Sequence, residues 1–170
     1  MTTAFWQQDS EKVILSFLGS PGLTANDVDV MATQSSLRAG LRSTGISVCD
    51  GSLFSQIKSN TAYFGIKNYP NGTTVVVLVM EKVRPGEQWP TLFADGSPEN
   101  QRIFTVLSVV KAFSEYAGTD VGELSFPAEA VITVLYKDPS GWWNGFYQGS
   151  LGNLPSNFVN EIPDCSLLPF

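Results

Sequence analysis

Short β-type segments separated by turn residues run along this chain. In the first half they cover residues 12–17, 28–33, 36–41, 53–58, 62–69 and 73–81, and most are rich in β-branched or aromatic residues. Glycine, proline, asparagine and aspartate interrupt them at residues 19–22, 44–45, 50–51 and 71–72. No window of about eleven residues shows helical periodicity. Regularly spaced short strands of this kind predict an all-β chain that begins with an antiparallel β-sandwich.

The Asn-Gly pair at residues 71–72 is a specific turn signal. It lies between two strand-like runs, and both residue types tolerate a positive φ. We therefore expect a hairpin that joins residues 62–69 to residues 73–81.

The adjacent residues Trp142 and Trp143 constrain the last third of the chain. Neighbouring side chains in a β-strand point to opposite faces, so both rings cannot enter one core. One ring must lie on the outside, where a large aromatic usually marks a contact surface. The pair therefore predicts a binding function for this segment.

Motifs on both sides of this pair follow one another in the order found in a known family. Residues 112–116 (AFSEY) look like a degenerate ALYDY box, and residues 123–126 (ELSF) match [DE]LSF. Further along come residues 141–145 (GWWNG), Gly149, Gly152 and residues 154–159 (LPSNFV). In sequence and spacing, about residues 105–163 resemble an SH3 domain, a small β-barrel.

The resemblance implies a peptide-binding site. SH3 domains bind left-handed polyproline helices in an aromatic groove, and such ligands lose little entropy because they are already extended. By motif, the groove would contain Tyr116, Trp142, Pro155, Asn157 and Phe158. Asp120 and Glu123 would lie on the long first loop, where the family pairs carboxylates with a ligand arginine. Core packing is the alternative for Trp142, and a solvated loop charge is the alternative for Glu123.

Two groove positions depart from the family pattern. Ser114 occupies the first tyrosine position of the ALYDY box, and Phe158 replaces the last tyrosine of the groove. One proline pocket therefore lacks an aromatic wall, which would weaken binding by about 1–3 kcal/mol. Either the ligand is atypical or the groove is partly retired. In the diverging turn, Glu129-Ala130 replaces a frequent glycine and acidic residue, a change expected to affect only stability.

The first block of the chain has its own family resemblance. It contains residues 5–8 (FWQQ), 23–28 (LTANDV), 36–41 (SLRAGL), 50–54 (DGSLF), 76–82 (VVLVMEK) and 88–92 (QWPTL). In order and spacing, residues 4–93 are similar to the CS domain, the β-sandwich of the small Hsp90 co-chaperone and of NudC proteins. The resemblance implies a protein-binding module directed at Hsp90 or at folding clients.

Three aromatic positions qualify this comparison. Tyr63-Phe64-Gly65 stands where the CS family usually has a tryptophan and an acidic turn, so no chaperone-contact residue is transferred. Trp6 and Trp89 are expected to pack in the core or at the rim of the sandwich, which suits their amphipathic rings.

The composition argues against catalysis. The chain has no histidine, so the usual general base, the catalytic triad and the commonest zinc ligand are missing. We interpret Cys49 and Cys165 as free thiols in a reducing cytosol. No paired-carboxylate, phosphate-loop or dinucleotide motif is present. We predict no enzymatic activity, no metal and no cofactor.

Charge and hydropathy narrow the partners. The net charge is −6, and the excess of acid lies in the C-terminal part because residues 1–93 are neutral overall. An acidic surface with aromatics favours basic partners and disfavours nucleic acid. The longest apolar run, residues 75–80, is too short to cross a bilayer, and residues near the start show no signal-peptide pattern. We therefore expect a cytoplasmic protein without membrane insertion.

These observations predict two modules. Residues 1–94 form the CS-like β-sandwich, residues 95–103 a polar linker, residues 104–163 the SH3 domain and residues 164–170 a C-terminal tail. The apolar end of the tail is expected to pack on one of the domains; the alternative is a free, ligand-like peptide.

The leading hypothesis is a non-catalytic adaptor or co-chaperone-like protein. The SH3 groove would bind a proline-rich, basic peptide, and the CS domain would bind Hsp90 or a client protein. The alternative is a structural or assembly subunit with a degenerate or covered SH3 groove. An open groove at Trp142 would favour the first hypothesis.

Overall fold

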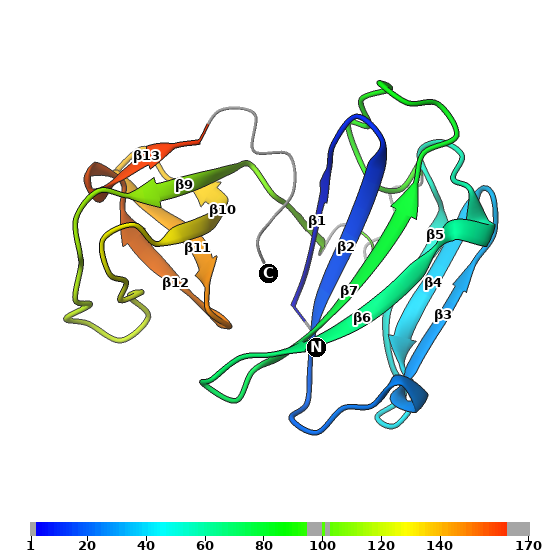
Figure 1. Ribbon diagram of the computed structural model, residues 1–170, viewed down its shortest axis with the longest axis horizontal. Helices are drawn as coiled ribbons and strands as arrows, with labels where there is room; N and C mark the ends of the chain where they lie inside the picture. Colours follow the sequence, from blue (N-terminus) through cyan, green and yellow to red (C-terminus); the bar gives the residue numbers. More distant parts are fainter. Residues whose placement is uncertain (1–2, 95–99, 101–102, 163–170) are drawn as a thin grey trace. The chain divides into compact units, whose positions relative to one another are not determined.

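The computed structural model describes residues 3–94, 100 and 103–162 of the chain. Among these residues there are β-strands and short 3₁₀ turns but no α-helix, as the turn-punctuated sequence predicts (Figure 1). The chain divides into two compact units. One contains the residues up to Asn68 and Gly72–Thr105, and the other contains Tyr69–Asn71 and the residues from Val106 onward.

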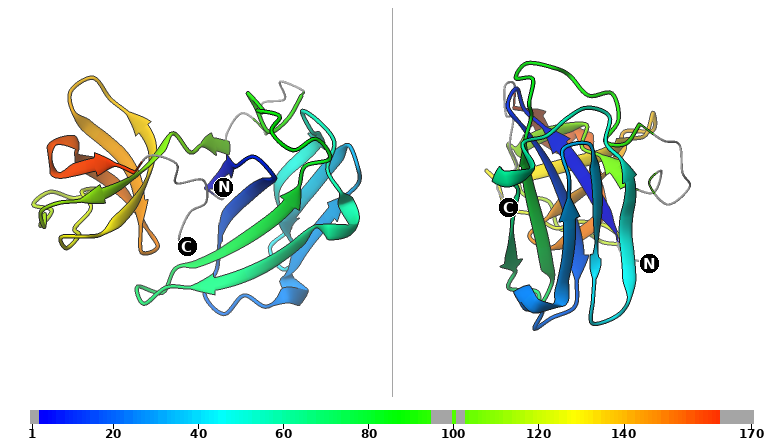
Figure 2. Two further views of the ribbon diagram at one scale, coloured as in Figure 1. Left: turned by 45° about the horizontal axis from the view of Figure 1, so that its top comes forward. Right: turned by 90° about the vertical axis from the view of Figure 1, so that its right-hand side faces the viewer.

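Two sheets form the first unit. The five-stranded sheet has the order β6-β7-β2-β1-β8 and the three-stranded sheet the order β3-β4-β5. The strands are β1 (Ala4–Gln8), β2 (Lys12–Gly19), β3 (Val28–Ala32), β4 (Ser36–Leu41), β5 (Ile46–Ser52), β6 (Tyr63–Asn68), β7 (Thr74–Glu81) and β8 (Ile103–Thr105). Apolar side chains of both sheets form one core between the two layers, so the unit is the expected sandwich (Figure 2).

Some local predictions for this unit are confirmed. The β6–β7 hairpin forms, and Gly72 in its turn has φ of +88°, a value that favours glycine. Trp6 and Trp89 are buried in the core. Cys49 is a buried free thiol, and burial raises its pKa to about 12. Cys165 lies outside the described residues.

Two local predictions are wrong. Residues 53–58 form no strand; Leu53 and Ile57 make only isolated bridges, to Phe93 and Lys82, because no neighbouring strand runs alongside them. Asp50 and Gly51 do not form a turn but lie inside β5, where Asp50 pairs with Arg38 across the sheet. The strand-like composition of residues 53–58 and the turn composition of residues 50–51 therefore misled the prediction.

The boundary between the units lies later than the sequence suggests. The predicted SH3 domain begins at residue 104, but β8 pairs in parallel with β1 in the sheet of the first unit. The indole Nε1 of Trp6 also donates a hydrogen bond to Thr105 Oγ1 at 3.0 Å. Most of the predicted linker and all of the predicted tail lie outside the described residues.

A buried lysine fixes one end of the sandwich. Lys82 is only 1% exposed, and its Nζ donates hydrogen bonds to Gln8 Oε1 (2.9 Å) and to the carbonyl oxygens of Asp9 (2.7 Å) and Glu87 (2.6 Å). Desolvation lowers its pKa, and the charges of Asp9 and Glu87 oppose that shift. The ammonium group therefore links the β1–β2 turn to the segment after β7.

The second unit contains one five-stranded sheet with the order β12-β11-β10-β9-β13. Its strands are β9 (Ser108–Ala112), β10 (Val131–Lys137), β11 (Trp142–Tyr147), β12 (Ser150–Pro155) and β13 (Val159–Glu161). Buried side chains from these strands and from the β9–β10 loop form a separate core. This is the small SH3-like barrel that the motifs predict.

Candidate peptide-binding groove

The two tryptophans of β11 face different surroundings. Trp142 lies directly across from Pro155 and is 42% exposed. Trp143 lies across from Leu154, a fully buried core residue, and packs against the same core. The two-residue period of the strand thus places one ring outside and the other toward the core, as the sequence predicts.

Tyr116 is the centre of an aromatic cluster. Its ring centroid lies 6.3 Å from that of Trp142, 5.2 Å from that of Phe158 and 5.8 Å from that of Phe126. The tilted and edge-on arrangements are those that aromatic pairs prefer. Tyr116 and Phe126 also exchange two backbone hydrogen bonds, both 2.9 Å, which fix the base of the β9–β10 loop. Phe126 belongs to the ELSF motif but was not predicted to support the groove.

The far side of the groove comes from a 3₁₀ turn. Ser156–Phe158 follows β12, and the Ser156 N–H donates to the carbonyl of Gly141, the residue before Trp142. The turn carries the exposed Asn157 and the half-buried Phe158, while Pro155 before it is buried. The structure therefore brings together Tyr116, Trp142, Pro155 and Phe158, with Asn157 beside them.

Glu123 turns into its own loop. Its Oε2 accepts hydrogen bonds from the Tyr116 hydroxyl (3.0 Å) and from the backbone N–H groups of Thr119 (2.7 Å) and Asp120 (3.2 Å). The Thr119 N–H is the main cause of a lowered pKa for the Glu123 carboxyl. Burial, and next the hydrogen bond to Glu123, raise the pKa of Tyr116. These contacts join the loop to the aromatic cluster.

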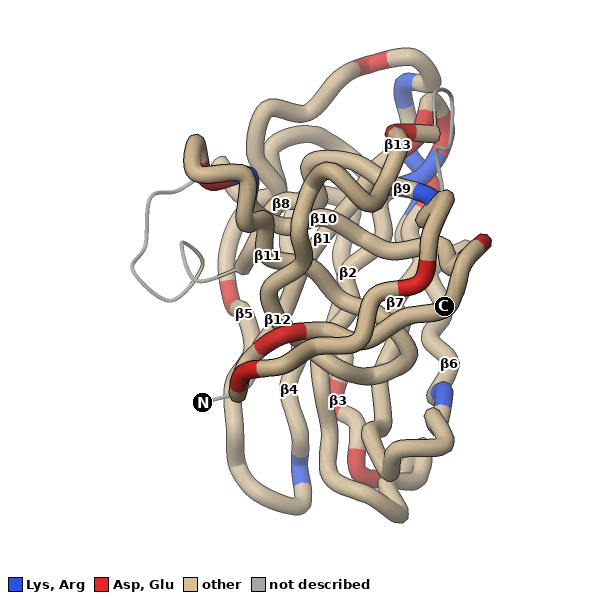
Figure 3. Tube along the Cα trace, turned by 90° about the vertical axis from the view of Figure 1, so that its left-hand side faces the viewer, with Lys and Arg blue, Asp and Glu red and all other residues tan. Residues whose placement is uncertain are grey.

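The other acidic residues of this unit differ in their contacts. Glu129 pairs with Lys111, and Glu161 pairs with Lys137. Asp138 accepts a hydrogen bond from the Ser140 N–H at 2.9 Å, which lowers the pKa of its carboxyl. Glu115 and Asp120 are exposed, and their carboxylates have no basic partner among the described residues. Figure 3 marks the charged positions along the chain.

Trp143 has its own contact on the side away from Trp142. The Nζ of Lys137, its direct cross-strand neighbour, lies 4.7 Å from the centre of its ring. Such a cation–π contact suits a half-covered ring. Trp143 therefore belongs to the packing of the unit, and Trp142 to its surface.

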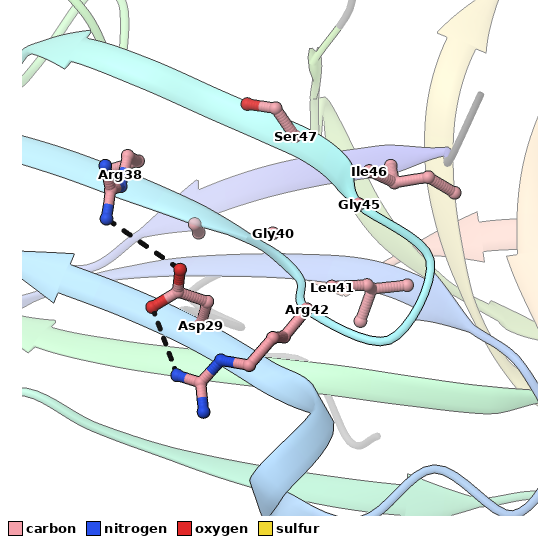
Figure 4. A pocket seen from close by; sticks show the side chains of 9 residues that line it. Asp29, Arg38, Gly40, Leu41, Arg42, Gly45, Ile46 and Ser47 are labelled. Carbon is pink, nitrogen blue, oxygen red and sulfur yellow. Dashed lines mark ion pairs between the residues drawn. The ribbon is translucent and has the colours of Figure 1, made fainter.

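The first unit has a cavity of about 180 Å³ on its three-stranded sheet (Figure 4). There the Asp29 carboxylate pairs with both Arg38 (3.8 Å) and Arg42 (3.5 Å). Gly40 is required because a Cβ would lie 2.4 Å from the carbonyl oxygen of Ile46. The charged side chains at this cavity already pair with one another, so the cavity is a weaker candidate site than the groove. No group of three or more acidic or cysteine residues suited to a metal occurs in the described ranges.

Both modules match known families. Residues 3–82 match the CS domain and residues 112–160 match the variant SH3 domain, which confirms the resemblance on which the prediction rests.

Among the parts of the chain that the structure describes, no helix has the length and apolar character to span a membrane.

Two relatives each match about a third of this chain. An SH3 and F-BAR domain-containing protein of Dictyostelium discoideum is 41% identical over 61 residues, which are 34% of this chain and 11% of that protein. The drebrin-like protein of the same organism is 44% identical over 54 residues, which are 31% and 11% of the two chains. The chain thus spans about a tenth of the length of these relatives.

Solved structures of SH3 domains are also similar to part of this chain. The Acanthamoeba myosin I SH3 domain bound to Acan125 is 40% identical with a TM-score of 0.32, and the match covers 32% of this chain and 95% of that one.

Proposed function

The chain joins a CS domain to a variant SH3 domain, and we propose that it is a non-catalytic adaptor whose SH3 groove binds a proline-rich, basic peptide. The observation that carries this proposal is the arrangement of Tyr116, Trp142 and Phe158. Their rings are close together, and Trp142 is exposed beside Pro155. Such a ridged aromatic surface fits a polyproline helix, whose extended backbone needs no reorganisation to bind.

The charge of this unit supports a basic residue in the ligand. Its two lysines, Lys111 and Lys137, are each paired with a glutamate, so the exposed Glu115 and Asp120 are not neutralised. An arginine or lysine beside the proline motif would find opposite charge there. Exposed pairs are screened by salt, so affinity should fall as the salt concentration rises.

For the CS domain we infer contact with a chaperone such as Hsp90 or with a folding client. The support is the family match over residues 3–82. No residue of this unit is assigned to that contact, since Tyr63 and Phe64 depart from the family pattern. A cytoplasmic location is part of the same proposal.

One observation favours the alternative of a structural subunit. Ser114 supplies no ring at a position where the family usually has one, so the aromatic surface is shorter than usual. A groove of this kind can serve as a packing surface rather than a ligand site.

A titration separates the two functions. Amide chemical shifts of the full chain are followed while a proline-rich peptide with a flanking arginine is added, and separately Hsp90. Shifts centred on Trp142, Tyr116 and Phe158 that weaken with added salt would support the adaptor. Salt-insensitive binding would argue against a basic ligand. An unchanged spectrum would favour the structural subunit over the adaptor. Shifts in residues 3–82 on addition of Hsp90 would support the chaperone contact.

A further inference from the structure

Among the described residues of the first unit, four strands lie at the edges of sheets, and three of them have a feature that discourages pairing with another chain. β8 is only three residues long. In β5 the Asp50 N–H donates to Asn100 Oδ1 (3.4 Å), and Asn100 Nδ2 donates to the Asp50 carbonyl (3.3 Å). β6 carries the charged Lys67. Short length, a covered backbone and a lysine are usual protections of a sheet edge.

The fourth edge strand, β3, has none of these protections among the residues that the structure describes (Figure 1). Its charged residue, Asp29, is already paired with two arginines (Figure 4). Met31 is 57% exposed, and Val30 and Ala32 pack against the core but are only partly buried. β3 is therefore an apolar strand at an open edge.

The register with β4 shows which backbone groups of β3 are open. At one end of the pair the Arg42 N–H donates to the Asp27 carbonyl (2.7 Å), and at the other the Thr33 N–H donates to the Ser36 carbonyl (2.9 Å). Hydrogen-bonded positions alternate along an antiparallel ladder, so the odd-numbered residues of β3 bond to β4. The backbone groups of the even-numbered residues point away from it.

Most of these outward groups are open. The Val28 N–H donates to the Ala25 carbonyl. The Val28 carbonyl and the N–H and carbonyl groups of Val30 and Ala32 make no hydrogen bond within the described part of the chain. An edge strand of this kind is a template for one more strand.

A second β3 in antiparallel orientation fits these groups. When the Val30 residues of two copies lie opposite each other, each N–H donates to the other carbonyl, and each Ala32 N–H donates to the Val28 carbonyl of the other copy. This register overlaps the whole strand and places Asp29 opposite Met31 of the other copy. The neighbouring registers overlap less, and one of them sets the two Asp29 carboxylates opposite each other, where like charges repel.

We propose that the edge of β3 is an interface between two copies of this chain, in which an antiparallel β3–β3 pair joins the two three-stranded sheets. The pairing satisfies the open backbone groups and covers apolar side chains of the strand. A single strand pair is a small interface, so we expect a reversible dimer with a dissociation constant of about 10–100 μM. The inference is independent of the peptide-binding groove.

Analytical ultracentrifugation of the full chain over a range of concentrations measures the association. Val30→Pro removes an outward N–H but no β3–β4 hydrogen bond, which is the setting in which an edge strand accepts proline. Because both copies lose a donor, it should raise the dissociation constant at least about tenfold. Val30→Ala is the matched control: it trims the side chain but keeps the N–H, so the constant should change by less than about threefold.

Amide hydrogen exchange of the unaltered chain locates the interface. The Val30 and Ala32 amides should exchange more slowly as the protein concentration rises, whereas the Met31 amide, which bonds to β4, should change little. An NOE between the Hα atoms of Asp29 in one copy and Met31 in a differently labelled copy would support the register.

A chain that remains monomeric at about 1 mM overturns the proposal, and the edge is then open to an extended segment of another protein. Concentration-dependent protection at β5, at β6 or in the second unit, without protection at β3, would place the contact between copies elsewhere and overturn it too. So would a Val30→Ala variant that dissociates as fully as Val30→Pro.

Discussion

Trp142 and Pro155 lie directly opposite each other in the β11–β12 pair, on the face away from the core residue Leu154. The proline is buried and the indole ring is exposed. An indole that lies across the strand pair from a rigid proline and beside the Tyr116 ring is already in position before a ligand arrives, which reduces the entropy lost on binding.

This arrangement predicts opposite effects for the two tryptophans. Trp142→Ala should weaken binding of the proline-rich peptide by at least about 2 kcal/mol while the unit melts nearly as before. Trp143→Ala should instead reduce stability, by less than the about 3–5 kcal/mol typical of a fully buried ring. Thermal melting and peptide titration of both variants check the pair. Normal binding by Trp142→Ala would rule out the groove as the functional surface.

Restoring the missing wall of the groove should strengthen binding. Ser114→Tyr places a ring at the first tyrosine position of the ALYDY-like box. We expect a gain of about 1–3 kcal/mol in peptide affinity, the size of one aromatic contact. Ser114→Ala is the control and should leave affinity unchanged in the same calorimetric titration. Absence of any gain would show that the pockets of this groove do not follow the family layout.

Removal of the buried lysine should destabilise the first unit. Lys82→Met leaves the carbonyl oxygens of Asp9 and Glu87 without their donor, so we expect a loss of at least about 2 kcal/mol. Lys58→Met is the matched control: Lys58 is exposed and pairs with Glu81 at 3.9 Å, which predicts a change below about 1 kcal/mol. Urea unfolding of the two variants, followed by the amide signals of the β2 residues, measures both losses of stability. Similar losses in the two variants would contradict the role given to Lys82.

The diverging turn carries a strained residue. Glu129 has φ of +73°, a conformation that costs a residue with a Cβ about 1 kcal/mol or more. Glu129→Gly should therefore stabilise the second unit by about 0.5–1 kcal/mol, less any contribution from the Lys111 ion pair. Glu115→Gly, at a residue without positive φ, should not stabilise it. A lower melting temperature for Glu129→Gly would contradict this account.

The stability of the second unit should fall in acid, in part because of Glu123. The pKa of its carboxyl is lower in the folded chain than the ordinary value of about 4.3. Its contribution is therefore complete above the unfolded-state pKa and is lost as the pH falls through the lower, folded value. Urea unfolding of Glu123→Gln between pH 6 and pH 3 should show a shallower loss than that of the unaltered chain. Asp138→Asn is a comparison that should flatten the curve for the same reason.

The groove could largely be predicted because its determinants are local. The order of the motifs fixes the strands, and the period of two fixes the faces of Trp142 and Trp143. The inward turn of Glu123 could not be predicted, because it depends on where the loop places the N–H groups of Thr119 and Asp120. Thr119, four residues before the carboxylate, is the nearest sequence signal of that contact.

Lys82 illustrates a signal that was present but not used. It follows Val76, Leu78 and Met80 at alternate positions, and all three are buried on one face of β7. Its burial could therefore have been predicted from parity, although its hydrogen-bond acceptors could not. Residues 53–58 failed for the opposite reason: they have strand-like composition but no partner strand.

The parallel pairing of β1 with β8 has a consequence for biosynthesis. Trp6 and Thr105, joined by a hydrogen bond, are 99 residues apart in the chain. As the ribosome makes the chain from its N-terminus, β1 can pair with β2 early but must wait for β8 until both sheets of the sandwich have been synthesised. During that interval the backbone of β1 is an open sheet edge, available to other nascent chains. The pairing of β8 with β1 is therefore among the last folding steps that protect the first unit from aggregation.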